Sequence, residues 1–129
     1  MLGLGGFSGT LGFQIDTINL FTAQQVVTYA AITSTSNSIA WNLNSAQNAT
    51  HTLTENTTLA NPTNMKSGGN YKFRVKQHAS AAKTLAFGSA YRDPSGLPLI
   101  STALNAVDVI EFDSDGTIMS LIGSSFNVG

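Results

Sequence analysis

Cysteine is absent from this sequence of 129 residues. Without a thiol, the chain can form neither a disulfide framework nor a thiolate site for a metal ion. The length predicts one domain, which buries about two thirds of the surface that the unfolded chain exposes. Its stability must therefore come from an apolar core or from association with other chains.

Charged residues are scarce as well, at 10% of the sequence against about 25% in an average soluble domain. Solubility then depends on hydroxyl and amide side chains rather than on ionic repulsion, so we expect copies of the chain to associate readily. The net charge of −1 disfavours nucleic acid as a partner.

Long apolar runs are also missing, because no stretch approaches the roughly 20 apolar residues that a membrane-spanning helix needs. The first residues, MLGLGGFSGTLGFQ, are apolar, but glycine interrupts them throughout and no Lys or Arg precedes them, which argues against a signal peptide. We interpret residues 1–24 as an extended apolar and glycine-rich arm that docks on another surface, and we expect no membrane partner. The docking side chains would be Leu2, Leu4, Phe7, Leu11 and Phe13.

Sustained helical periodicity is missing from every window of about twelve residues, whereas a two-residue alternation recurs. The clearest case is YKFRVKQ, where Tyr71, Phe73 and Val75 alternate with Lys72, Arg74 and Lys76, as in a strand with one buried face. Further strands are expected in QVVTYAAIT, SIAWNL, NATHTLTENTTL, KTLAFG and NAVDVIEFDSDGTIMSLIG. Short strands with turn signals at this spacing predict an all-β fold, in which residues 25–129 form an antiparallel β-sandwich or a jelly-roll-like domain.

Charges of opposite sign are separated along the chain. Residues 66–92 hold all six basic residues and no acidic one, whereas residues 93–129 hold five acidic residues and no basic one. One interpretation is that basic and acidic strands lie opposite each other across a sheet or a subunit contact. The other is that the basic strand face, formed by Lys72, Arg74 and Lys76, meets an acidic partner such as a polyanionic glycan or an acidic protein surface.

Candidate catalytic bases are limited to the two histidines, His51 and His78. Nucleophilic catalysis needs a Ser or Thr next to a histidine that a third group orients, and neither histidine lies in such a motif. We interpret His51 as a strand residue and His78 as a turn residue.

Acidic residues offer two further candidate sites. Asp113, Asp115 and Gly116 resemble the start of a calcium-binding loop, but no terminal glutamate follows, and Asp115–Gly116 suits a tight hairpin turn. Asp108 and Glu111 are three positions apart on an expected strand, so they should point to opposite faces, unlike a catalytic carboxylate pair. We therefore expect no enzyme activity, no cofactor and no metal site.

The stretch SAYRDPSGLPLIST contains two prolines and a glycine within a few residues and predicts a long irregular loop. Loops of this kind lie at the surface and often carry binding residues. Tyr91, Arg92 and Asp93 are the candidates for exposed contacts with a partner.

Several short motifs follow one another between about residues 39 and 122: NTTL, NPTN, GG, VKQ, TL followed by FG, the loop around Tyr91, ST, and NAVDV. In this order they resemble a segment of structural proteins of tailed bacteriophages, of the tail-fibre and head-decoration type. Within this segment, Asp108 is expected to cap backbone donors of a neighbouring loop.

The resemblance implies a small β-domain that forms a homotrimer on the exterior of the virion. Its partners would be other copies of itself and the major capsid protein or another virion protein. The implied function is that of a non-enzymatic capsid decoration (cement) protein or head fibre, whose arm docks on the shell or swaps between subunits. The alternative is a tail-fibre or tail-tip protein that binds a receptor or surface glycan of the host.

Overall fold

The structure is a computed structural model, and it describes residues 26–129. This part of the chain contains ten strands and no helix, which confirms the predicted all-β class. No helix in it is thus long and apolar enough to cross a membrane. The predicted arm, residues 1–24, lies outside the described residues.

The strands vary from two to ten residues in length. Their bounds are β1 (Tyr29–Ala31), β2 (Ser34–Thr35), β3 (Ser38–Ile39), β4 (Asn48–Thr52), β5 (Thr57–Leu59), β6 (Ser67–Lys76), β7 (Leu85–Phe87), β8 (Tyr91–Arg92), β9 (Val107–Asp115) and β10 (Met119–Ser125).

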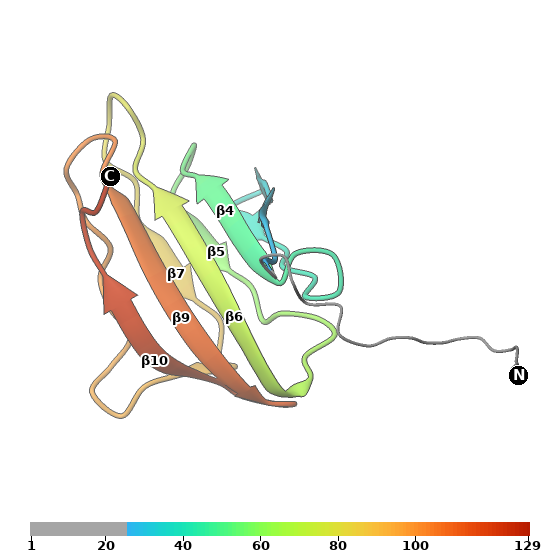
Figure 1. Ribbon diagram of the computed structural model, residues 1–129. Coiled ribbons are helices and arrows are strands. Elements are labelled where there is room, and N and C mark those ends of the chain that lie inside the picture. The colour runs from blue at the N-terminus through green and yellow to red at the C-terminus, as the bar shows by residue number, and fades with distance from the viewer. Residues whose placement is uncertain (1–25) are drawn as a thin grey trace, which may run out of the picture.

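These strands form two separate sheets (Figure 1). The larger sheet has the order β1-β4-β6-β9-β10-β8, and the smaller one has the order β2-β3-β5-β7. From β4 to β7, each strand belongs to the sheet that the preceding strand does not. The pairs β3–β5, β4–β6 and β5–β7 are parallel. The chain therefore winds as a two-sheet β-solenoid, to which the antiparallel hairpin of β9 and β10 is added.

The antiparallel pairing that the sequence predicted holds for only part of the fold. Among residues 26–129, five of the eight strand pairings are parallel. The segment NATHTLTENTTL, expected to be one strand, forms β4 and β5, because residues 53–56 cross from one sheet to the other. Alternation indicates which side chains are buried, but it does not indicate which strand lies alongside.

The core lies between the two sheets and is centred on Trp41. Its ring centroid lies 6.5 Å from that of Tyr71, 5.6 Å from Phe73 and 6.4 Å from Phe112, in edge-to-face or tilted arrangements. The indole N–H donates to the carbonyl oxygen of Ala46 at 2.6 Å, so the polar atom of this buried side chain is satisfied. The predicted strand SIAWNL does bury Ile39, Trp41 and Leu43, although only its first two residues form a strand, β3.

Candidate functional site

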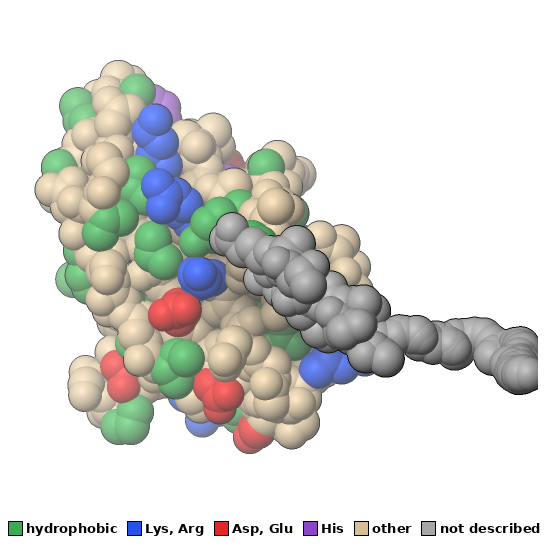
Figure 2. All heavy atoms as spheres, in the orientation of Figure 1, with side chains coloured by type: hydrophobic (Ala, Val, Ile, Leu, Met, Phe, Trp, Pro, Cys, Tyr) green, Lys and Arg blue, Asp and Glu red, His purple; other side chains and the backbone are tan. Residues whose placement is uncertain are grey.

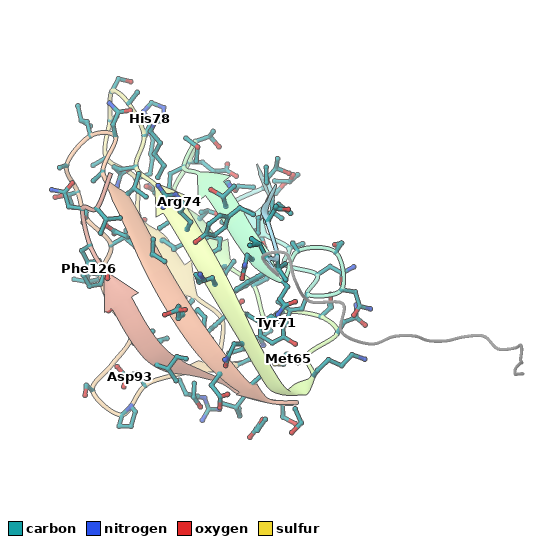
Figure 3. The ribbon with its side chains drawn as sticks, viewed as in Figure 1. Met65, Tyr71, Arg74, His78, Asp93 and Phe126 are labelled. Carbon is teal, nitrogen blue, oxygen red and sulfur yellow. The ribbon has the colours of Figure 1, made fainter. Side chains whose placement is uncertain are left out.

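Positive charge gathers on the outer face of the larger sheet, along β6. The predicted alternation is confirmed: Tyr71, Phe73 and Val75 are buried, whereas Lys72, Arg74 and Lys76 lie on the opposite face. Side chains two residues apart on a strand are separated by about 6.7 Å. In Figure 2 basic side chains follow one another down the upper part of this face, with acidic side chains below them and further basic ones at the lower edge. Figure 3 labels Arg74 on β6.

Lys72 has an acidic neighbour in the sheet. It lies between Asn48 of β4 and Glu111 of β9. The first interpretation of the charge distribution, that basic and acidic strands lie opposite each other, is thus confirmed for β6 and β9. On β9, Asp113 is also exposed, opposite Asn70.

Arg74 and Lys76 differ from Lys72 in their neighbours. Arg74 lies between Thr50 and Val109, and Lys76 lies between Thr52 and Val107. The residues in register on both flanking strands are therefore uncharged. The positive charge of these two side chains is left uncompensated within the sheet.

Tyr29 of β1 adds an aromatic ring to this surface. The Nζ atom of Lys72 lies 5.9 Å from the ring centroid, and the Cζ atom of Arg74 lies 6.0 Å from it, within the range of cation–π contacts. Tyr29 is still 39% exposed. Because β4 lies between β1 and β6, the three side chains meet above β4. We call the residues Tyr29, Thr50, Thr52, Lys72, Arg74 and Lys76 the cationic face.

The predicted exposure of Tyr91 is wrong. Only 2% of this residue is exposed, and its hydroxyl donates to the carbonyl oxygen of Ala60 at 2.9 Å. Its ring centroid lies 5.7 Å from that of Phe87 and 5.1 Å from that of Phe112. Burial raises the pKa of the phenol. Tyr91 is therefore a core residue, buried because β8 joins the larger sheet beside β10.

Arg92 and Asp93 interact with their own loop. Arg92 is exposed, and its Nε atom donates to the carbonyl oxygen of Ser89 at 2.8 Å. The half-buried Asp93 accepts from the backbone N–H of Ser95 at 3.3 Å, at the turn where Figure 3 labels it. A contact between these two residues and a partner stays a prediction.

His51 has the strand role that the sequence predicted, with one unusual feature. It is a buried residue of β4, and its Nδ1 atom lies 2.7 Å from the carbonyl oxygen of Ile32. A carbonyl only accepts, so Nδ1 must carry the proton. The Nε2 atom is buried without a hydrogen-bond partner.

A surface hollow of about 390 Å³ adjoins His51, lined also by Ser34. The hydroxyl of Ser34 donates to the carboxylate of Glu55, which also accepts from the backbone N–H of Asn37 at 3.0 Å. These donors, Ser34 first, lower the pKa of Glu55. Ser34 donates to Glu55 and not to His51, so these side chains do not form the Ser–His arrangement sought in the sequence.

His78 stabilises the turn after β6, as predicted. Its Nδ1 atom accepts from the backbone N–H groups of Ser80 and Ala81, both at 3.1 Å. The Ser80 hydroxyl lies 3.3 Å from the same atom. The lone pair of Nδ1 is occupied by these donors. The imidazole ring therefore stabilises the turn.

The acidic residues stabilise turns and loops. Asp115 accepts from the backbone N–H groups of Ile118 at 2.7 Å and Thr117 at 2.8 Å, and these bonds lower its pKa. Gly116 has a φ of 95°, which confirms the predicted hairpin turn. Among residues 26–129, no group of three or more acidic or histidine side chains is placed to hold a metal ion.

Asp108 caps a neighbouring loop, as predicted. Its buried carboxylate accepts from the backbone N–H of Ser101 at 2.6 Å, from the Ser101 hydroxyl at 2.7 Å and from the backbone N–H of Asn127 at 2.8 Å. Glu111 is exposed on the other face of β9, so the expectation that these two carboxylates point apart is confirmed.

Sequence reasoning identified the basic residues of the cationic face but missed Tyr29, Thr50 and Thr52. No local signal marks them, since they become neighbours of β6 only through the strand order β1-β4-β6. The proposed docking side chains of the arm, Leu2, Leu4, Phe7, Leu11 and Phe13, lie outside the described residues.

No family model, curated protein or solved structure matches this chain. The resemblance to phage structural proteins therefore rests on the short motifs alone.

Proposed function

We propose that the chain is a non-enzymatic structural protein on the exterior of a bacteriophage particle, either a homotrimeric capsid decoration (cement) protein or a head fibre. The observation that carries the proposal is the use of buried polar side chains to hold loops and turns. Gln77 is an example: its amide donates to the carbonyl oxygens of Lys83 and Ser101 and accepts from the backbone N–H groups of His78 and Lys83.

A chain whose buried polar groups hold its own loops suits a rigid support. We propose that the fold acts as a sandwich in one respect: its two sheets are stacked over a shared core. This arrangement gives a stiff body with two broad faces. Such a body can attach to a large particle through its outer faces, while its core stays unchanged.

Exposed apolar side chains supply surface for assembly. Among residues 26–129, the large apolar residues with high exposure are Val26, Val27, Tyr29, Leu99, Leu104, Ile122, Phe126 and Val128. Apolar surface of this kind and a low charge content favour contacts with other chains, either copies of the same chain or a shell protein. The arm, residues 1–24, would add apolar area worth about 25 cal/mol per Å² when buried.

Immunogold electron microscopy of intact particles tests this proposal. Label over the head is expected, and its absence from particles would refute a role in the virion. Deleting residues 1–24 should abolish attachment of the purified protein to particles that lack it, while circular dichroism still reports a folded β-domain. Attachment by the truncated protein would refute docking through the arm.

A tail-fibre or tail-tip protein that binds a host glycan is the second candidate. The observation in its favour is the cationic face, where an exposed aromatic ring, hydroxyls and cations lie together. Label confined to the tail in the same micrographs would favour this candidate over capsid decoration.

A further inference from the structure

We propose that the cationic face is a binding site for an acidic polysaccharide, one whose sugar units carry carboxylate groups. The site rests on the second candidate function above and names the chemical class of its glycan, but it depends neither on the arm nor on where the protein sits in a particle. It is formed by strands β1, β4 and β6 of the larger sheet.

Uncompensated charge is the first reason. Arg74 and Lys76 lie on one face of β6 between uncharged residues of both flanking strands, while Lys72 has Glu111 opposite it. Arg74 is half-buried, which strengthens its interaction with an anion relative to a fully hydrated side chain. A carboxylate placed between Arg74 and Lys76 would form charge-assisted hydrogen bonds with both.

The groups around these cations can bind the other parts of a sugar unit, which are its hydroxyl groups and its ring. Thr50 and Thr52 on β4 place hydroxyl groups beside Arg74 and Lys76. The ring of Tyr29, 6.0 Å from the guanidinium of Arg74 and still 39% exposed, offers an apolar surface for a sugar ring. Ligand sites typically combine such an aromatic surface with a few polar groups that fix orientation.

The acidic residues on the same sheet narrow the choice of polyanion. Glu111 and Asp113 are exposed on the strand next to β6, at the end of the row away from Lys76. A polymer with a phosphate at every unit, such as nucleic acid, would meet these carboxylates as it runs along β6. A polysaccharide also presents many hydroxyl groups, which can donate hydrogen bonds to these carboxylates and accept them from the cations.

Isothermal titration of the full chain with polygalacturonate tests the site, with neutral dextran of the same length as the comparison. We expect binding to polygalacturonate that weakens with added salt, and none to dextran. The variants Arg74→Gln and Lys76→Gln should each weaken binding roughly tenfold. Tyr29→Leu should also weaken it, although the net charge is unchanged.

Lys66→Gln is the matched control, because it removes one charge just before β6, at the end of the strand opposite Lys76. It should leave the affinity within about twofold, since a distant exposed charge is largely screened. Thermal unfolding of every variant separates loss of binding from loss of fold. Equal losses in Lys66→Gln and Arg74→Gln would overturn the site, as would failure of the wild-type chain to bind polygalacturonate.

Two further ligands test the assignment to a glycan. Poly-glutamate and single-stranded DNA of similar length should bind more weakly than polygalacturonate. Equal or tighter binding of either would overturn the assignment to a glycan.

Attachment of Arg74→Gln to phage particles is measured separately. This variant should attach normally, so failure of the glycan site and failure of the virion role give different results.

Discussion

The coil from β1 to β7 is paired in parallel except between β2 and β3. It uses the same alternation of buried and exposed side chains as the hairpin of β9 and β10, but different signals determine the pairing of the two regions. In the hairpin, Met119 pairs with Ser114 across a short turn. In the coil, Asn48 pairs with Lys72, one full turn of the coil away. The partner of a hairpin strand is thus close in sequence, whereas the partner of a coil strand is not.

This difference shows where the stability of each region comes from. The hairpin turn is fixed locally by Gly116 and by the carboxylate of Asp115, which holds two backbone N–H groups. The coil has to close loops of about 20 residues before its strands meet, at an entropic cost that packing in the core must offset. Substitutions in the core should therefore affect the coil most, and those in the turn should have smaller, local effects.

Trp41→Ala should have the largest effect. It removes the ring at the centre of the coil and leaves the carbonyl oxygen of Ala46 without its donor, so we expect a loss of about 3–5 kcal/mol in the free energy of unfolding. Trp41 is the only tryptophan, so urea unfolding should be followed by circular dichroism. Leu99→Ala, at a residue 90% exposed, is the control and should change stability by less than about 0.5 kcal/mol. A loss below that of a typical surface substitution would contradict the central role of Trp41.

Asp108→Ala should come next, because this carboxylate ties the loop at Ser101 and the backbone at Asn127 to β9. Removing the acceptor of these buried donors should cost about 2–3 kcal/mol. Hydrogen exchange should increase at the amides of Ser101 and Asn127 before it increases in the coil. Asp113→Ala, at an exposed position of the same strand, should leave both amides protected. Unchanged exchange at these amides in Asp108→Ala would contradict the capping role.

The sequence predicts those features of the fold that depend on neighbours in the chain. The alternation in YKFRVKQ, the turn at Gly116 and the capping by Asp108 all agree with the structure. The parallel pairing and the division of NATHTLTENTTL into β4 and β5 were not predicted, because both depend on contacts between residues distant in sequence. A threonine-rich segment also gives no sharp signal where the chain leaves one sheet for the other.

Contacts between residues distant in sequence also explain why the candidate site was predicted only in part. Three cations at alternate positions marked one face of β6, but the ring beside them belongs to β1, two strands away in the sheet. Tyr91 was predicted to be exposed because prolines and a glycine follow it. Its neighbours Phe87 and Phe112 bury it, and only the tertiary structure brings Phe112 there.

Gly116→Ala tests the hairpin at its turn. With a φ of 95°, an alanine at this position is strained, and we expect a loss of about 1 kcal/mol. Gly123→Ala on β10 is the matched control, since its φ is not positive and its new Cβ would lie 3.6 Å from the Glu111 carboxylate, an ordinary contact. Urea unfolding should therefore separate the two variants. Equal losses would mean that the backbone conformation of the turn contributes nothing specific.

The smallest effect should be the pH dependence of the turn. Backbone N–H groups of Ile118 and Thr117 stabilise ionised Asp115, so its pKa in the folded protein is below the ordinary value. Its contribution is therefore present above the unfolded-state pKa of about 3.9 and is lost as the pH falls through the lower folded-state value. Carboxyl NMR should find Asp115 titrating below the range of an ordinary aspartate, and Asp115→Asn should reduce the loss of stability as the pH falls below about 4. Because the side chain is exposed, the change should be confined to the hairpin and leave exchange in the coil unaltered. An ordinary pKa for Asp115 would mean that the turn is held by the conformation of Gly116 and not by the carboxylate.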